Sequence, residues 1–199
     1  MPQINYYFSV LSPFTYLSGL RLEEIAAKHG ADIQYKPLDI MALFARTGGT
    51  PPKDRHPNRI DYRMQELVRA ATKTGLPMNF NPAHWPTNAA PASYAIIAAA
   101  NAGGGDLGAL CHSVLRAVWA EEKDIAQDDV IAQCLVAAGY EASLINSGML
   151  TGAEQYGRNL EEAIDAGAFG APFYITDGDA RFWGHDRLDD LDAHLSGDL

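Results

Sequence analysis

A serine lies where an apolar strand pattern gives way to a helical one. Residues Ile4 to Val10 are rich in β-forming side chains, and Ser12 and Pro13 follow them. Serine is favoured as a helix N-cap and proline in the first helical turn, so the pair is typical of a helix start. Backbone N–H groups are unpaired at such a position, and the Ser12 hydroxyl can donate a further hydrogen bond to a bound thiolate. From this segment alone the plain helix start is favoured, and the thiolate-binding role stays open.

A second candidate segment runs from Gly167 to Phe173 and places a proline at the start of a strand. The Ala171–Pro172 bond can be cis at modest cost, and a cis bond exposes the backbone of Ala171 to pairing with an extended peptide. The alternative is a trans proline that only begins the strand. The sequence does not separate the two.

A third segment, Phe182 to Leu188, again lies between a strand and a helix. His185 and Asp186 either face the amine and carboxylate of a ligand, or Asp186 is simply the N-cap of the following helix. Trp183, in the same segment, is expected to be a core aromatic.

Basic residues are concentrated in one part of an acidic chain. The formal net charge is -10, which argues against nucleic acid as a partner. Lys53, Arg55, Arg59 and Arg63 nevertheless cluster within a few turns of chain. This cluster is either a site for a small anion or the solvated start of a helix.

Thiol and metal chemistry by the chain's own residues is not indicated. A disulfide oxidoreductase needs a Cys-x-x-Cys pair, and Ser12 begins a segment, SPFT, with no thiol, which excludes dithiol exchange there. Cys111 and Cys134 lie far apart in helical patterns and are expected to be buried free thiols. The six histidines have no ligand-like spacing, so no metal is expected.

The elements that position these residues follow from periodicity. Strand patterns at 4–10 and 33–38 flank a helix expected from Pro13 to about His29. Helical patterns then dominate residues 39–167, and a hairpin and a last helix follow. This order predicts an α/β, thioredoxin-like fold (βαβ…ββα) with a large all-α insertion. The expected domains are 1–38 plus 168–199 for the thioredoxin-like part and 39–167 for the helical part.

The first residues, MPQINYYFSV, contain neither a basic segment nor a long apolar run, and no stretch approaches the length of a membrane span. We therefore expect a cytoplasmic protein that does not interact with a membrane.

Six segments that together extend over nearly the whole chain carry a family resemblance. In order they are FSVLSPF, a Pro-Pro loop with a basic helix start, LPMNFNPAHWP, RAVWAEEKDI, GAFGAPFYI and FWGHDRL. In these segments the chain resembles the 2-hydroxychromene-2-carboxylate isomerases, which are relatives of the kappa-class glutathione transferases and of DsbA-type oxidoreductases. The resemblance implies a thioredoxin fold with a helical insertion, glutathione as cofactor, a small aromatic substrate and a homodimer.

The resemblance also assigns roles to particular residues. It implies that Ser12 hydrogen-bonds the glutathione thiolate and that the backbone of Ala171, before Pro172, pairs with the cysteinyl part. It also implies that His185 and Asp186 receive the γ-glutamyl end of glutathione and that Arg59 faces its glycyl carboxylate.

Two departures from the family pattern touch this proposed site. Gly48-Gly49-Thr50 stands where relatives often have Asn before the Pro-Pro pair, and His185 replaces a residue that is commonly Gln or Ser. Both leave room for altered affinity or for a different thiol.

The implied reaction is the interconversion of 2-hydroxychromene-2-carboxylate and trans-o-hydroxybenzylidenepyruvate by reversible addition of the glutathione thiolate. The alternatives are a kappa-like glutathione transferase and a non-catalytic glutathione-binding protein. Four residues are candidates for an aromatic wall or are plain core, namely Phe8, Phe14, Tyr62 and Trp85.

Overall fold

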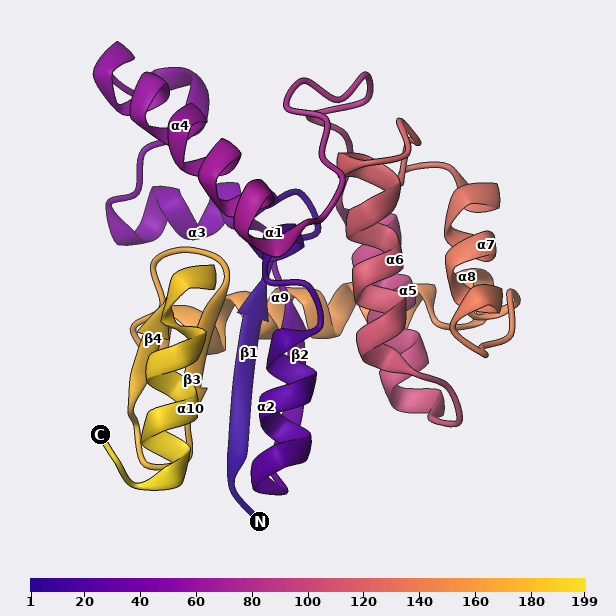
Figure 1. The fold of residues 1–199 in the computed structure, drawn as a ribbon. Helices are drawn as coiled ribbons and strands as arrows, with labels where there is room; N and C mark the ends of the chain where they lie inside the picture. The colour runs from indigo at the N-terminus through magenta and orange to yellow at the C-terminus, as the bar shows by residue number, and fades with distance from the viewer.

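The computed structural model describes residues 1–199 and contains a four-stranded sheet in the order β2-β1-β3-β4 (Figure 1). The strands are β1 (Gln3–Phe8), β2 (Asp32–Pro37), β3 (Phe173–Thr176) and β4 (Arg181–Trp183). β1 pairs in parallel with β2, while β3 is antiparallel to both β1 and β4. The parallel pair and the C-terminal hairpin confirm the predicted thioredoxin-like α/β fold.

The two central strands, β1 and β3, are buried on both faces, which explains why they are apolar along most of their length. Side chains alternate across a strand, so Tyr6 lies opposite Tyr174 on one face and Tyr7 lies opposite Phe173 on the other. This register also brings the end of β1 beside the start of β3. The chain segments that follow β1 and precede β3 therefore meet at the end of the sheet where β1 finishes and β3 begins.

Ten α-helices accompany the sheet, and most of them lie between β2 and β3, as the sequence predicts. Their bounds are α1 (Pro13–Leu17), α2 (Arg21–His29), α3 (Ile40–Thr47), α4 (Pro57–Thr74), α5 (Ala90–Ala102), α6 (Leu107–Trp119), α7 (Asp128–Ala137), α8 (Leu144–Ser147), α9 (Met149–Asp165) and α10 (Leu188–Ser196). In Figure 1, α2 and α10 cover the near face of the sheet, α9 crosses behind it, and α5 to α8 stand to one side. None of these helices combines the length and apolar character that crossing a bilayer requires.

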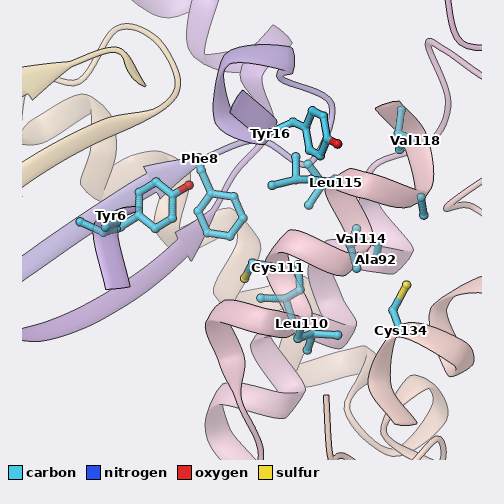
Figure 2. Packing of buried hydrophobic residues seen from close by; sticks show 14 of the residues in the cluster. Tyr6, Phe8, Tyr16, Ala92, Leu110, Cys111, Val114, Leu115, Val118 and Cys134 are labelled. Atoms are coloured by element: carbon cyan, nitrogen blue, oxygen red, sulfur yellow. The ribbon is translucent and has the colours of Figure 1, made fainter. Parts of the chain in front are cut away.

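The sheet and the helical segment share one core. A single cluster of 33 buried residues includes Tyr6 and Phe8 of β1 and Leu110, Cys111 and Leu115 of α6, which face one another in Figure 2. Both cysteines are buried free thiols, as predicted. Whether residues 39–167 form a domain of their own stays a prediction.

The single helix predicted from Pro13 to His29 is wrong. The chain forms two helices, α1 and α2, and Gly19 between them has a left-handed φ of 59°. Glycine adopts this conformation at little cost, and it ends a helix. The Ser18 hydroxyl also donates to the Phe14 carbonyl at 3.1 Å. Ser12 therefore begins a helix of only five residues, which limits the contribution of a helix dipole at this point.

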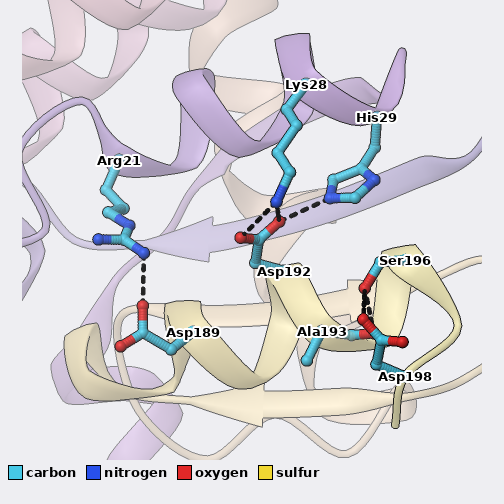
Figure 3. Close-up of polar contacts among 8 residues, drawn as sticks. All are labelled: Arg21, Lys28, His29, Asp189, Asp192, Ala193, Ser196 and Asp198. Atoms are coloured by element: carbon cyan, nitrogen blue, oxygen red, sulfur yellow. Dashed lines mark hydrogen bonds and ion pairs between the residues drawn. The ribbon is translucent and has the colours of Figure 1, made fainter.

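Ion pairs join α2 to α10 on the near face of the molecule (Figure 3). Arg21 Nη2 lies 2.5 Å from Asp189, while Lys28 Nζ and His29 Nε2 lie 2.8 and 2.6 Å from the same oxygen of Asp192. The hydrogen bonds from Lys28 and His29 lower the pKa of Asp192. Arg21, Asp189 and Lys28 are exposed, so their ion pairs orient the two helices more than they stabilise the fold, whereas His29 and Asp192 are more buried.

A carboxyl group is buried between α2, β2 and α6. Glu23 Oε1 accepts a hydrogen bond from the Tyr35 hydroxyl at 2.9 Å, while its Oε2 is buried without a partner. Burial raises the pKa of Glu23 above 4.5, and the nearby Asp106 and Glu24 raise it further. At neutral pH the ionised form of this group therefore costs folding free energy.

A Glu23→Gln variant is expected to be more stable than the wild type at neutral pH, with a gain that shrinks in acid. In the unfolded chain Glu23 loses its proton as the pH rises through about 4.5, whereas in the folded chain it keeps the proton to a higher pH. The wild type therefore loses stability as the pH rises through the pKa of Glu23 in the folded state. Gln cannot ionise and keeps the acceptor for Tyr35. Urea unfolding near pH 4 and near pH 8 measures the difference, with the exposed Glu24→Gln as control. A gain that does not depend on pH would contradict this assignment.

Candidate functional site

Ser12 joins two segments that are 159 positions apart in the sequence. Its Oγ accepts a hydrogen bond from the Thr15 N–H at 3.2 Å, the N-cap arrangement that the Ser-Pro pair predicts. The same hydroxyl donates to the carbonyl oxygen of Ala171, also at 3.2 Å. The first and second candidate segments therefore meet where β1 finishes and β3 begins, as the strand register requires.

The Ala171–Pro172 bond is cis, which settles the choice that the sequence left open. The Pro172 carbonyl accepts from the Gly184 N–H at 3.0 Å, which ties the turn to the end of β4. Ala171 has no such partner for its own N–H, and its carbonyl accepts only from Ser12. Ala171 is half-buried, and its backbone can pair with an extended chain in the manner of an added strand.

The third candidate segment also reaches this place. The ring of His185 stacks on that of Phe14, with centroids 5.1 Å apart and 20° between the planes. Burial lowers the pKa of His185, against the opposing charges of Asp186 and Glu66, so its imidazole is neutral at neutral pH. A neutral imidazole offers one N–H donor and one acceptor nitrogen to a ligand.

Asp186 does not cap the helix that follows it, so that alternative is wrong. It belongs to a 3₁₀ turn, His185–Arg187, and α10 begins at Leu188 without a side-chain cap. The Asp186 carboxylate is exposed and pairs with Arg187 at 3.2 Å. One carboxylate oxygen lies over Gly184, only 2.5 Å from where a Cβ would stand, and φ there is 114°. A side chain at position 184 would displace Asp186.

The basic cluster also brings Arg63 to this place. Arg63 of α4 is half-buried, and its guanidinium lies 5.9 Å from the centre of the Phe14 ring. It makes no ion pair, and burial together with the nearby Arg55 lowers its pKa. Arg59 is exposed, and its charge acts on neighbouring Arg55. Its role with a glycyl carboxylate stays a prediction, and the structure adds Arg63 as a candidate.

Arg55 adds a second cation without an acidic partner. Its Nε donates to the Thr50 carbonyl at 2.9 Å, and its guanidinium lies 5.8 Å from the centre of the Phe44 ring. Burial and the charge of Arg59 lower the pKa of Arg55. Cations that are partly desolvated and lack a carboxylate partner favour the binding of an anion.

Two of the four candidate aromatic residues flank Ser12. Phe14 follows it in α1, and Trp85 donates from its indole Nε1 to the Leu11 carbonyl at 3.0 Å. Phe8, by contrast, is fully buried in the core, and Tyr62 is 61% exposed on α4. Phe14 and Trp85 are therefore the two that the structure places beside Ser12.

Trp183, expected in the core, is 54% exposed, so that prediction is wrong. Its ring contacts Phe169, with centroids 4.8 Å apart, and its indole nitrogen would lie 2.4 Å from a Cβ at Gly170. The indole thus packs on the turn that leads to Ala171. Position 183 is the last residue of an edge strand, so the face it occupies is uncovered there.

The chain matches known proteins along most of its length. Residues 3–196 match the family model of the DSBA-like thioredoxin domain. A 2-hydroxychromene-2-carboxylate isomerase of Sphingobium xenophagum is 31% identical over 200 residues, which cover 96% of this chain and 97% of that protein.

Two solved structures are similar over 98% of this chain. The structure of a 2-hydroxychromene-2-carboxylate isomerase has a TM-score of 0.78 and 27% identity, and 95% of it is covered. The cytosolic disulfide reductase DsbM from Pseudomonas aeruginosa, solved with GSH, has a TM-score of 0.73 and 19% identity, with 98% covered. The likeness to DsbM is one of fold.

Proposed function

Because this chain belongs to the 2-hydroxychromene-2-carboxylate isomerase family of DsbA-like thioredoxin proteins and is an isomerase, we propose that it acts on an aromatic 2-oxo acid with glutathione as a bound thiol catalyst. When bound, the cofactor supplies a thiolate that adds reversibly to a conjugated carbon–carbon double bond and so allows rotation about it. The chain's own residues bind and orient both molecules. The proposal includes, from the family resemblance, a cytoplasmic homodimer.

One observation carries the glutathione assignment. The Ser12 hydroxyl donates to the Ala171 carbonyl at 3.2 Å, the Ala171 N–H is unpaired, and the chain has no cysteine at this place. A hydroxyl donor fits a thiolate, and an N–H and C=O of one residue fit an extended peptide. A tripeptide thiol satisfies both, whereas the chain itself has no thiol there. The residues therefore fit glutathione.

Charged and aromatic residues around Ser12 support the rest of the proposal. The unpaired cations Arg63 and Arg55 suit the carboxylates of glutathione and of a 2-oxo acid. Phe14 and Trp85 suit the aromatic ring of the substrate. For the γ-glutamyl end, the neutral His185 and the exposed Asp186 supply an acceptor and a negative charge.

Two measurements test this function together. Calorimetry is expected to show binding of glutathione to the purified protein, and absence of binding would overturn the proposal.

A spectrophotometric assay with 2-hydroxychromene-2-carboxylate is then expected to show isomerisation that requires added glutathione. S-Methylglutathione, which has no thiol, is the matched control and should bind without supporting the reaction. Because the thiol is regenerated, its concentration should not fall during turnover. A stable adduct with loss of free thiol would instead indicate a transferase.

A further inference from the structure

The single proton of the Ser12 hydroxyl already has an acceptor. A serine hydroxyl is one donor and accepts through its lone pairs. Here the Thr15 N–H donates to Oγ at 3.2 Å, and Oγ donates to the Ala171 carbonyl at 3.2 Å. In this arrangement Ser12 has no proton left for a thiolate. Any role with a thiolate requires that the bond to Ala171 first be given up.

Ala171 is placed to receive a replacement donor. Its carbonyl accepts only from Ser12, its N–H is unpaired, and Pro172 after it has no N–H. In antiparallel pairing one residue exchanges both an N–H and a C=O with the residue opposite. A ligand residue with an amide N–H and a C=O therefore pairs with Ala171, and its N–H keeps the carbonyl oxygen hydrogen-bonded when the Ser12 hydroxyl turns away.

We propose that Ser12 is a two-position donor, which bonds the Ala171 carbonyl in the free protein and turns to a bound thiolate only when the amide N–H of an N-acylated cysteine takes that carbonyl. This inference rests on the proposed function and names the class of thiol that the site accepts. The thiol proton leaves to solvent water, and the Ser12 hydroxyl proton stays on Oγ throughout. Thiolate formation is thereby coupled to correct seating of the peptide backbone, so a thiol without the acylamino group is not activated.

The decisive comparison uses two ligands that differ in one group. Glutathione carries the cysteinyl N–H, and its depsipeptide analogue has an ester oxygen there instead. The pKa of each bound thiol is followed by the ultraviolet absorbance of the thiolate and compared with the same thiol free in solution. A hydrogen bond from Ser12 to the thiolate is expected to lower the pKa of bound glutathione by about one to two units more than that of the analogue.

Variants of Ser12 show whether its hydroxyl causes the difference in pKa between the two bound thiols. Ser12→Ala is expected to give both bound thiols the same pKa, whereas Ser12→Thr, which keeps a hydroxyl, is expected to preserve the difference. An equal lowering for both ligands in the wild type would overturn the inference. A difference that persists in Ser12→Ala would do so as well.

A second measurement needs glutathione alone. The carbonyl carbon of Ala171, followed by nuclear magnetic resonance, is expected to shift on Ser12→Ala substitution in the free protein and not in the glutathione complex. A shift of the same size in both states would show that Ser12 never leaves Ala171, and would overturn the inference while the proposed function stands. Failure of glutathione to bind in calorimetry is a different result, because it overturns the proposed function and the inference together.

Discussion

An Arg63→Gln variant is expected to weaken binding of at least one carboxylate ligand, glutathione or the 2-oxo acid, by about ten- to a hundredfold. A hydrogen bond between charged partners contributes about 1.5–3 kcal/mol, which corresponds to a change of that size in affinity. Arg63 is half-buried beside Phe14 and has no acidic partner in the chain, so its charge is available to a ligand. The dissociation constant of glutathione and the KM for the substrate measure the effect.

Arg59→Gln is the matched control, because it removes the same charge from the same helix at an exposed position. It is expected to change either constant by less than about twofold, as for other weakly coupled surface charges. Arg63→Lys should fall between the wild type and Arg63→Gln, since lysine keeps the charge and loses the planar fork. If Arg59→Gln weakened binding more than Arg63→Gln, the residue named by the family resemblance would hold the carboxylate after all.

Stability gives an independent check on the role of Arg63. A partly buried cation without a partner is not expected to stabilise the fold, so Arg63→Gln should unfold at the same urea concentration as the wild type or a higher one. Loss of binding together with loss of stability would indicate a structural role instead. The two measurements together distinguish a ligand-binding arginine from one that only supports α4.

The choice between Arg59 and Arg63 shows where prediction from sequence ends. Both belong to the basic cluster, but the phase of α4 is set by its buried residues Leu67 and Ala70. Arg59 and Arg63 are four residues apart, so both lie on the side of α4 that carries Leu67 and Ala70. The phase of the helix was available in the sequence, but it does not separate the two arginines. What was absent is how the Gly- and Pro-rich loop before α4 places the helix over Phe14.

The meeting of Ser12 with Ala171 was predictable for a physical reason. A parallel strand pair followed by an antiparallel one puts the end of β1 beside the start of β3, whatever the intervening helices do. The elements themselves follow from hydrophobic period and turn residues. The break at Gly19 was missed because a glycine within a helical pattern is often tolerated, and only its left-handed φ shows that the helix ends. The exposure of Trp183 was missed because apolarity alone does not tell a strand's covered side from its open one.

The largest expected effect on stability concerns the crossing of α5 and α9. Gly152 of α9 is buried, and a Cβ there would lie 2.8 Å from Tyr94 Cβ and 2.9 Å from Tyr94 Cα. One turn earlier, a Cβ at Gly148 would lie 2.1 Å from that of Ala98. The two helices therefore touch backbone to side chain, and this contact needs glycine. The same helix leads into the turn that carries Ala171, so the crossing also fixes the site.

Gly152→Ala is expected to destabilise the protein by about 1–3 kcal/mol, because a methyl group there must push α5 and α9 apart. Gly157→Ala, in the same helix, is the matched control. It is exposed with nothing within 4 Å of its Cβ position, and should stabilise by about 0.5–1 kcal/mol through helix propensity. Urea unfolding of both variants measures the two changes, which should have opposite sign. Stabilisation by both would mean that α9 lies farther from α5 than the structure has it, and the position of Ala171 relative to the helical segment would then rest on other contacts.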